Sequence, residues 1–157
     1  MTAHSDRPTF EPPERALMVR EPYVSLILTH RKTWELRASA TKLRGRIGLI
    51  RSGSGLIVGE CEIVDVLGPL TLRQLRDTSF ISAAERDEIA REDKPPYVAR
   101  DGQSKTFAWV VDNPIIYDEP IPYRHPSGAI IFVDLTRPGV LCSEASPSAQ
   151  ERQPRLF

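Results

Sequence analysis

The spacing of apolar residues changes along the chain, and each spacing predicts a different kind of element. Five runs combine β-branched and other apolar residues in short alternating or continuous stretches, which is typical of strands. Prolines interrupt the fourth of these runs. We expect strands within residues 15–19, 45–52, 55–67, 107–123 and 128–135, with the last of them buried.

Three other segments carry helical spacing or helix-start signals. Within 21–31, the residues that fall on one helix face are Tyr23, Leu26, Ile27 and His30. Pro22 suits a first helical position. Residues 71–77 and 82–92 each begin with a Thr or Ser that can cap a helix N-terminus. We therefore predict three helices in these segments.

Residues 33–38 alternate in the manner of a strand with one buried face. Trp34 and Leu36 share one face, which we expect to pack on the core. Thr33, Glu35 and Arg37 share the other face and are expected to point outward together.

The order of these elements is strand, helix, several strands, helices and strands. Parallel βαβ alternation does not fit this order, so we predict one α+β domain with a curved, mainly antiparallel sheet and flanking helices. Both ends of the chain are rich in proline or small polar residues and poor in apolar ones. We expect flexible tails over residues 1–13 and 139–157 around a domain of residues 14–138.

The formal net charge is zero, because 21 Lys and Arg residues balance 21 Asp and Glu residues. This balance argues against a protein that binds through a high overall positive charge. The charges are unevenly distributed, however: residues 14–51 hold nine Lys or Arg against three Glu, and residues 77–93 are acidic. One region can thus present a positive surface, or the two can be solvated faces that cancel.

No apolar run is long enough to span a bilayer, and the N-terminus lacks the apolar core of a signal peptide. The two cysteines, Cys61 and Cys142, show no CxxC or Cys/His spacing of a metal site. We therefore expect reduced thiols, a cytoplasmic protein, no membrane contact and no metal or other cofactor. Common catalytic signatures such as a P-loop or a GxSxG elbow are absent from the sequence.

Two short stretches contain groups that can bind a ligand. In residues 28–37, Glu35 can accept from an amine or a ring N–H, and Lys32 and Arg37 can bind a phosphate or a carbonyl oxygen. The plain alternative is a surface ion pair of little energetic value. In residues 123–129, a His-Pro-Ser-Gly turn offers His125 and Ser127, or is an ordinary exposed turn.

The stretch 26–37, LILTHRKTWELR, resembles the signature of the ASCH domain, a member of the PUA-like superfamily. The family pattern is Gly-x-Lys-x-x-Glu-x-Arg; Lys32, Glu35 and Arg37 match it, and His30 stands at the glycine. The similarity extends over about residues 16–135. The resemblance implies a β-barrel-like sheet with a cleft lined by the motif, and a function in binding RNA or a modified nucleobase.

The resemblance leaves an enzymatic function open as well. Some small ASCH-like proteins deacetylate N4-acetylcytidine with a lysine, a threonine and a glutamate. Lys32 matches that lysine, Glu35 stands where the threonine would be, and Glu85 or Glu88 could supply the glutamate by position. The missing threonine favours a binding module. Ribonuclease activity through Lys32, Glu35 and His125 is a further alternative.

We therefore expect a ligand site that includes Lys32, Thr33, Glu35, Arg37, Tyr23, His125 and Ser127. Lys32 and Glu35 would be catalytic only in the enzymatic alternatives. Beside Glu35, Lys32 is expected to keep its charge, which suits it to hold a phosphate or carbonyl oxygen. The partner would be RNA or a modified nucleoside, with Arg44 and Arg46 among the phosphate contacts.

The histidine at the glycine position of the motif affects the end of the preceding helix. Glycine after a helix often adopts the left-handed conformation that ends it. Either His30 adopts that conformation with some strain, or the helix ends in another way.

Overall fold

Six strands and three helices make up the part of the chain that the computed structural model describes, residues 10–142. The portions of the two expected tails in residues 1–9 and 143–157 lie outside it. In chain order the elements are β1 (Arg15–Val19), α1 (Tyr23–Leu28), β2 (Trp34–Arg37), β3 (Gly45–Arg51), β4 (Leu56–Leu67), α2 (Leu72–Asp77), α3 (Ala83–Glu92), β5 (Phe107–Pro122) and β6 (Phe132–Asp134).

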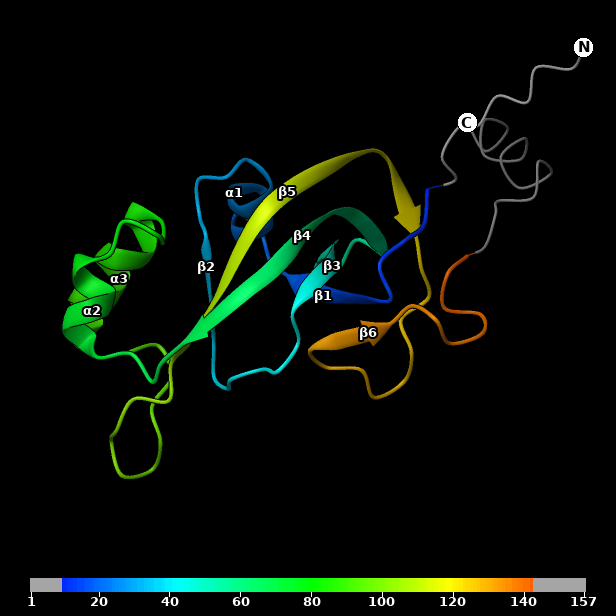
Figure 1. Ribbon diagram of the computed structural model, residues 1–157. Helices are drawn as coiled ribbons and strands as arrows, with labels where there is room; N and C mark the ends of the chain where they lie inside the picture. Colours follow the sequence, from blue (N-terminus) through cyan, green and yellow to red (C-terminus); the bar gives the residue numbers. More distant parts are fainter. Residues whose placement is uncertain (1–9, 143–157) are drawn as a thin grey trace, which may run out of the picture.

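The strands form one curved sheet in the order β2-β5-β4-β3-β1-β6. Only β1 and β3 run parallel; the other neighbours are antiparallel. The long strands β4 and β5 bend together into a half-barrel, and α1 lies over one end of it (Figure 1). The predicted α+β fold with a mainly antiparallel curved sheet is confirmed.

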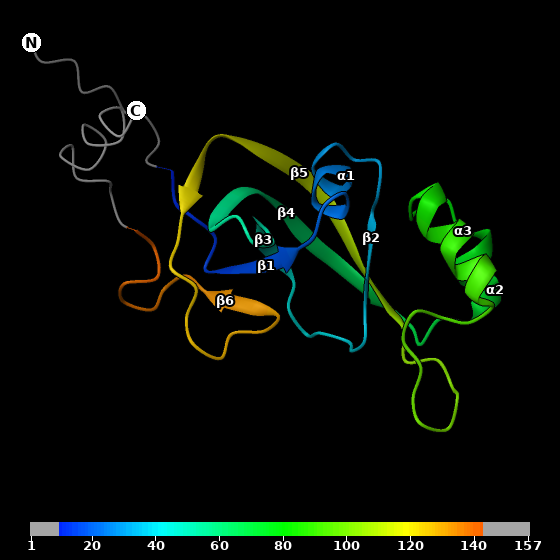
Figure 2. The same cartoon turned by 180° about the vertical axis from the view of Figure 1, so that it is seen from behind.

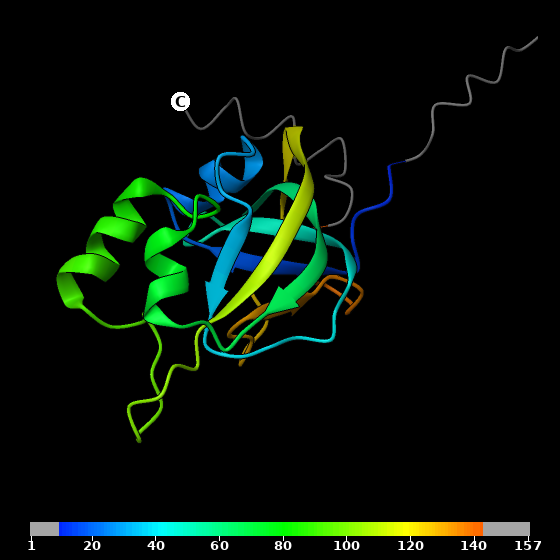
Figure 3. The ribbon, with the colours of Figure 1, turned by 60° about the vertical axis from the view of Figure 1, so that its left-hand side comes forward.

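Helices α2 and α3 lie to one side of the sheet, next to β2 (Figures 2 and 3). Both begin with the capping residues that the sequence indicates. Thr71 and Ser82 each accept from the backbone N–H three residues later, and Gln74 and Glu85 return the bond to the cap. Because these reciprocal bonds satisfy donors at the helix start, the local sequence fixes where α2 and α3 begin.

The main hydrophobic core lies between α1 and the concave face of the sheet. Its members are apolar side chains from α1, β1, β3, β4 and β5, including Ile27, Leu49, Val58 and Trp109. Cys61 lies in this core, and burial raises the pKa of its thiol to about 12. A second, smaller cluster joins α2 and α3 to Leu36 of β2.

Helix α1 ends in a Schellman motif whose left-handed residue is His30. The backbone N–H of His30 donates to Ile27 O at 3.0 Å, and that of Arg31 donates to Leu26 O at 2.8 Å. His30 has φ +60°, so histidine occupies the conformation that glycine usually takes. The first of the two expected outcomes for this position is therefore the one observed.

Replacing His30 by glycine should stabilise the fold by about 0.5–1 kcal/mol. Relief of the left-handed strain exceeds the added freedom of glycine in the unfolded chain. Urea unfolding of His30→Gly and His30→Ala separates the causes, because alanine removes the imidazole but keeps the strain. Equal losses of stability in the two variants would show that the left-handed conformation of His30 does not lower the stability of the fold.

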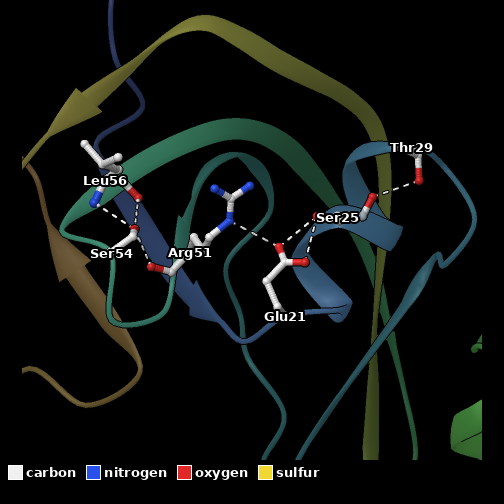
Figure 4. A network of polar contacts seen from close by, with 6 residues as sticks. All are labelled: Glu21, Ser25, Thr29, Arg51, Ser54 and Leu56. Carbon is white, nitrogen blue, oxygen red and sulfur yellow. Dashed lines mark hydrogen bonds and ion pairs between the residues drawn. The ribbon is translucent and has the colours of Figure 1, made fainter.

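A polar network fixes the start of α1 against the β3–β4 turn (Figure 4). Glu21 accepts from Ser25 Oγ at 2.7 Å and from Arg51 Nε at 3.2 Å. Ser54 Oγ in turn donates to the Arg51 backbone oxygen at 2.6 Å. These bonds join the segment before α1 to the end of β3 and the β3–β4 turn.

The C-terminal part of the domain differs from the prediction in its last two strands. The last strand has only three residues, and Ile130, expected within a buried strand, is 81% exposed. Strand β5 continues through its prolines, with bulges in its pairing to β4. Past the expected boundary at 138, Val140 is buried and Leu141 bridges to Tyr123. We propose that the packed domain ends near residue 142.

Candidate nucleotide-binding cleft

A cleft of about 590 Å³ opens between the sheet and helix α3. Strand β2 contributes Glu35 and Arg37, α1 contributes Tyr23, and Arg20 follows the end of β1. The opposite wall is formed by α3 and the segment after it, between residues 85 and 97. Three of the residues expected from the motif and its helix therefore line one concave surface.

Lys32 lies behind this surface and does not line it. Its side chain is 1% exposed, and its Nζ donates to Glu85 Oε1 at 2.5 Å. The same Nζ is 4.0 Å from Glu35 Oε2 and 5.0 Å from the centre of the Tyr23 ring. The ammonium thus holds together three groups that do line the cleft, from β2, α1 and α3.

Glu35 and Arg37 form a pair that leaves polar atoms without partners. Arg37 Nε is 3.4 Å from Glu35 Oε1, and Arg37 Nη2 donates to Met18 O at 2.6 Å. Glu35 Oε2 and Arg37 Nε are buried, yet neither makes a hydrogen bond with any described residue. Each of these two atoms has an ion-pair neighbour instead, because Glu35 Oε2 is 4.0 Å from Lys32 Nζ and Arg37 Nε is 3.4 Å from Glu35 Oε1.

The ionisation of Glu35 reflects its burial. Burial raises the pKa of Glu35 above its ordinary value of 4.5, and the charges of Lys32 and Arg37 oppose that rise. The expectation that Glu35 points away from the core is wrong: in the β2–β5 pairing Glu35 lies opposite Trp109, a residue of the main core, whereas Leu36 faces the cluster formed with α2 and α3. The charge of Glu35 is therefore set by its burial together with the two neighbouring cations.

The remaining residues expected at the site lie elsewhere. Thr33 is tied into the backbone by bonds to Phe80 and Val111. His125 Nε2 is 2.8 Å from Ala129 O, within the turn after β5. Thr33, His125 and Ser127 do not line the cleft.

Two of the expected phosphate contacts have other partners. Arg46 is bound to Glu60 through Nε at 2.7 Å and through Nη2 at 2.9 Å. Glu60 also accepts from Tyr117 Oη at 2.9 Å, and these bonds lower the pKa of its carboxyl. Arg44 Nη1 donates to backbone oxygens of its own loop.

Sequence reasoning missed several lining residues. Arg20, Ser52 and Tyr97 line the cleft but belong to no motif, and Tyr97 lies in a proline-rich segment after α3. Glu85 and Glu88 were indicated only by position, and both line the cleft. Their spacing of three residues on α3 is the one local signal for a shared face.

Two further features of residues 10–142 concern metal ions and membranes. No group of three or more His, Cys, Asp or Glu side chains in this range is arranged to hold a metal ion. Nor does this range contain a helix with the length and apolar character needed to cross a membrane.

The chain is similar to solved structures of an ASCH protein from Zymomonas mobilis. Its wild-type crystal structure is 15% identical with a TM-score of 0.45, covering 68% of this chain and 69% of that one. A serine-to-alanine mutant of it is 14% identical with a TM-score of 0.49, covering 93% and 99%. No match was found among curated proteins.

The family model of the ASCH domain matches residues 17–120, which include the whole of β2, β3 and β4, most of β5 and the last three residues of β1. The matched range contains the motif residues Lys32, Glu35 and Arg37. The chain therefore belongs to the ASCH domain family, a PUA-like fold family associated with RNA binding.

Proposed function

We propose that this protein binds RNA, or a modified nucleoside, by taking one nucleotide into the cleft between β2 and α3. The observation that carries the proposal is the cleft lined by the carboxyl group of Glu35 and the guanidinium group of Arg37, which lie 3.4 Å apart on one wall. An acceptor and a donor lie side by side, as the edge of a nucleobase requires. The volume of about 590 Å³ is within the range of small-molecule sites.

Each part of the cleft has a role in this proposal. Glu35 accepts from a ring N–H or an exocyclic amine, and Arg37 donates to a carbonyl oxygen. The half-buried ring of Tyr23 supplies an aromatic surface next to the base. Lys32 positions Glu35 and Glu85 from behind and makes no contact with the base.

Glu35→Gln and Arg37→Gln should each weaken binding of a short single-stranded RNA about tenfold or more. Either change leaves the partner of the pair, and the ligand group it faces, less well satisfied. Fluorescence anisotropy with labelled RNA and calorimetry with N4-acetylcytidine measure the effect. Affinity for RNA should also fall as salt concentration rises.

The matched control for these variants is Arg73→Gln on α2. The Arg73 side chain is 93% exposed and lies away from the cleft residues. Its replacement should leave binding unchanged. A protein that binds neither RNA nor nucleoside, or a control that loses as much affinity as Arg37→Gln, contradicts the proposal.

One observation favours a second function, hydrolysis of N4-acetylcytidine or RNA. Lys32 and Glu85, which could supply the lysine and glutamate of the related deacetylases, are in direct contact. The arrangement lacks their threonine, since Glu35 takes that position, and Lys32 is enclosed between two carboxylates. Incubation with either substrate, with product detection by mass spectrometry, tests it. Turnover that is lost in Lys32→Arg while binding remains would make this the function.

A further inference from the structure

Most charged side chains that line the cleft already have an oppositely charged neighbour. The pairs are Arg37 with Glu35 at 3.4 Å, Lys94 with Glu92 at 3.7 Å, and Glu85 with Lys32 at 2.5 Å. Two lining charges have no ion-pair or side-chain hydrogen-bond partner among residues 10–142: Arg20 and Glu88. Apart from the Glu35–Arg37 pair assigned to the base, the cleft thus presents one cation and one carboxylate without such a partner among the described residues.

These two charges belong to different walls of the cleft. Arg20 follows β1 on the sheet side, whereas Glu88 lies on α3. Tyr23 is influenced by both: burial, then Glu85 and Glu88, raise the pKa of its hydroxyl, and Arg20 lowers it. Both side chains are exposed, whereas Glu35 is buried, so the free charges lie nearer to solvent than the Glu35–Arg37 pair.

We propose that Arg20 binds the phosphate and Glu88 the ribose hydroxyls of a nucleotide whose base reaches Glu35 and Arg37. This assignment rests on the proposed function of the cleft. It follows the order of groups in a nucleotide, with the base deepest and the sugar and phosphate nearer to solvent. The cleft would then select ribonucleotides over both nucleosides and deoxyribonucleotides.

The chemistry of each group supports its assignment. A guanidinium offers several donors that match phosphate oxygens and keeps its charge at any working pH. A carboxylate only accepts, so Glu88 needs a donor, which a ribose hydroxyl supplies and a phosphate does not. Glu88 also repels a phosphate, which keeps that group on the Arg20 wall. The 2′-hydroxyl is the group that distinguishes RNA from DNA.

The test compares matched ligands on Arg20→Ala and Glu88→Ala. Calorimetry uses the four ribonucleoside 5′-monophosphates, the corresponding nucleosides and the 2′-deoxy monophosphates. Arg20→Ala should reduce the preference for nucleotide over nucleoside about tenfold, as expected for loss of a charged hydrogen bond. Glu88→Ala should reduce the preference for ribose over deoxyribose about fivefold, with little loss for the deoxy ligands.

Two controls lie on α3 outside the cleft lining: Arg91→Ala and Asp87→Ala, both at exposed positions. They should leave both preferences intact. A four-nucleotide RNA and its DNA counterpart, measured in parallel, show whether free nucleotides or RNA strands are the preferred source of the ligand.

The outcomes separate this assignment from the function on which it rests. If the wild-type protein binds RNA or nucleotides, but both variants keep both preferences, the roles of Arg20 and Glu88 are wrong and the cleft function stands. If the wild-type protein binds none of these ligands, both fail. Loss of either preference in a control variant also overturns the assignment, because it shows a general effect of charge.

Discussion

Replacing Lys32 by methionine should lower the free energy of unfolding by about 3–5 kcal/mol, as expected when one partner of a buried ion pair is removed. Methionine fills a similar volume but cannot donate to Glu85 Oε1 or compensate Glu35. Two carboxylates that are about nine-tenths buried would then face each other without a cation. Urea denaturation of the two proteins measures the difference.

The matched control is Lys94→Met, which removes an exposed ion pair with Glu92. Such pairs are worth little, so we expect a change below about 1 kcal/mol. An equal loss in both variants would show that the buried ion pair contributes no more to the free energy of unfolding than the exposed one.

The loss in Lys32→Met should shrink as the pH falls from 7 toward 4.5. Burial raises the pKa of Glu35 above its ordinary value of 4.5. Ionisation of Glu35 therefore lowers the free energy of unfolding, fully above the raised pKa and not at all below 4.5. Lys32 offsets part of the penalty, and its removal therefore matters most where Glu35 is ionised. A stability loss in Lys32→Met that does not change with pH would contradict this prediction.

Replacing Gly59 by alanine should destabilise the fold by about 3 kcal/mol, the upper part of the range for overpacking. A Cβ at this position of β4 would lie 2.4 Å from Ile115 O and 2.5 Å from Leu28 Cδ2. The first atom belongs to the backbone of β5 and cannot move away easily. The second belongs to α1, so displacement of Leu28 would also move the helix that carries Tyr23.

Gly48→Ala on β3 is the control for this substitution. Its Cβ would meet only Ala16 Cβ at 3.1 Å and Ile57 Cγ2 at 3.2 Å among side chains. We expect a clearly smaller loss in urea denaturation. If Gly59→Ala and Gly48→Ala lose the same stability, the close contacts of Gly59 with α1 and β5 carry no extra cost for a side chain, and the prediction is wrong.

Local signals in the sequence predicted much of the fold. Thr71 and Ser82 cap their helices because a capping box depends on residues only three apart. The final strand was harder, because an apolar run does not show whether another element covers it. Ile130 lies just after a turn and before β6, and nothing in the described chain buries it.

The candidate site was only partly predictable. Alternation placed Glu35 and Arg37 on one face of β2, but periodicity cannot show what packs on that face. Lys32 meets Glu85 across 53 residues of sequence, a contact that no local pattern contains. His125 and Ser127 have suitable chemistry but do not line the cleft, although Ile130 of the same loop does.

The connection between β4 and β5 is a long insertion whose two ends lie close together. Leu67 pairs with Ala108, and Leu70 N–H donates to Thr106 O at 2.8 Å, so the insertion leaves and rejoins the sheet at nearly the same place. It carries α2, α3 and one whole wall of the cleft, including Glu88. Grafting a different insertion between residues 67 and 108 would therefore exchange one wall of the cleft, provided that the graft supplies a carboxylate for Lys32 and apolar cover for Leu36, and this makes the segment a unit for engineering new ligand specificity.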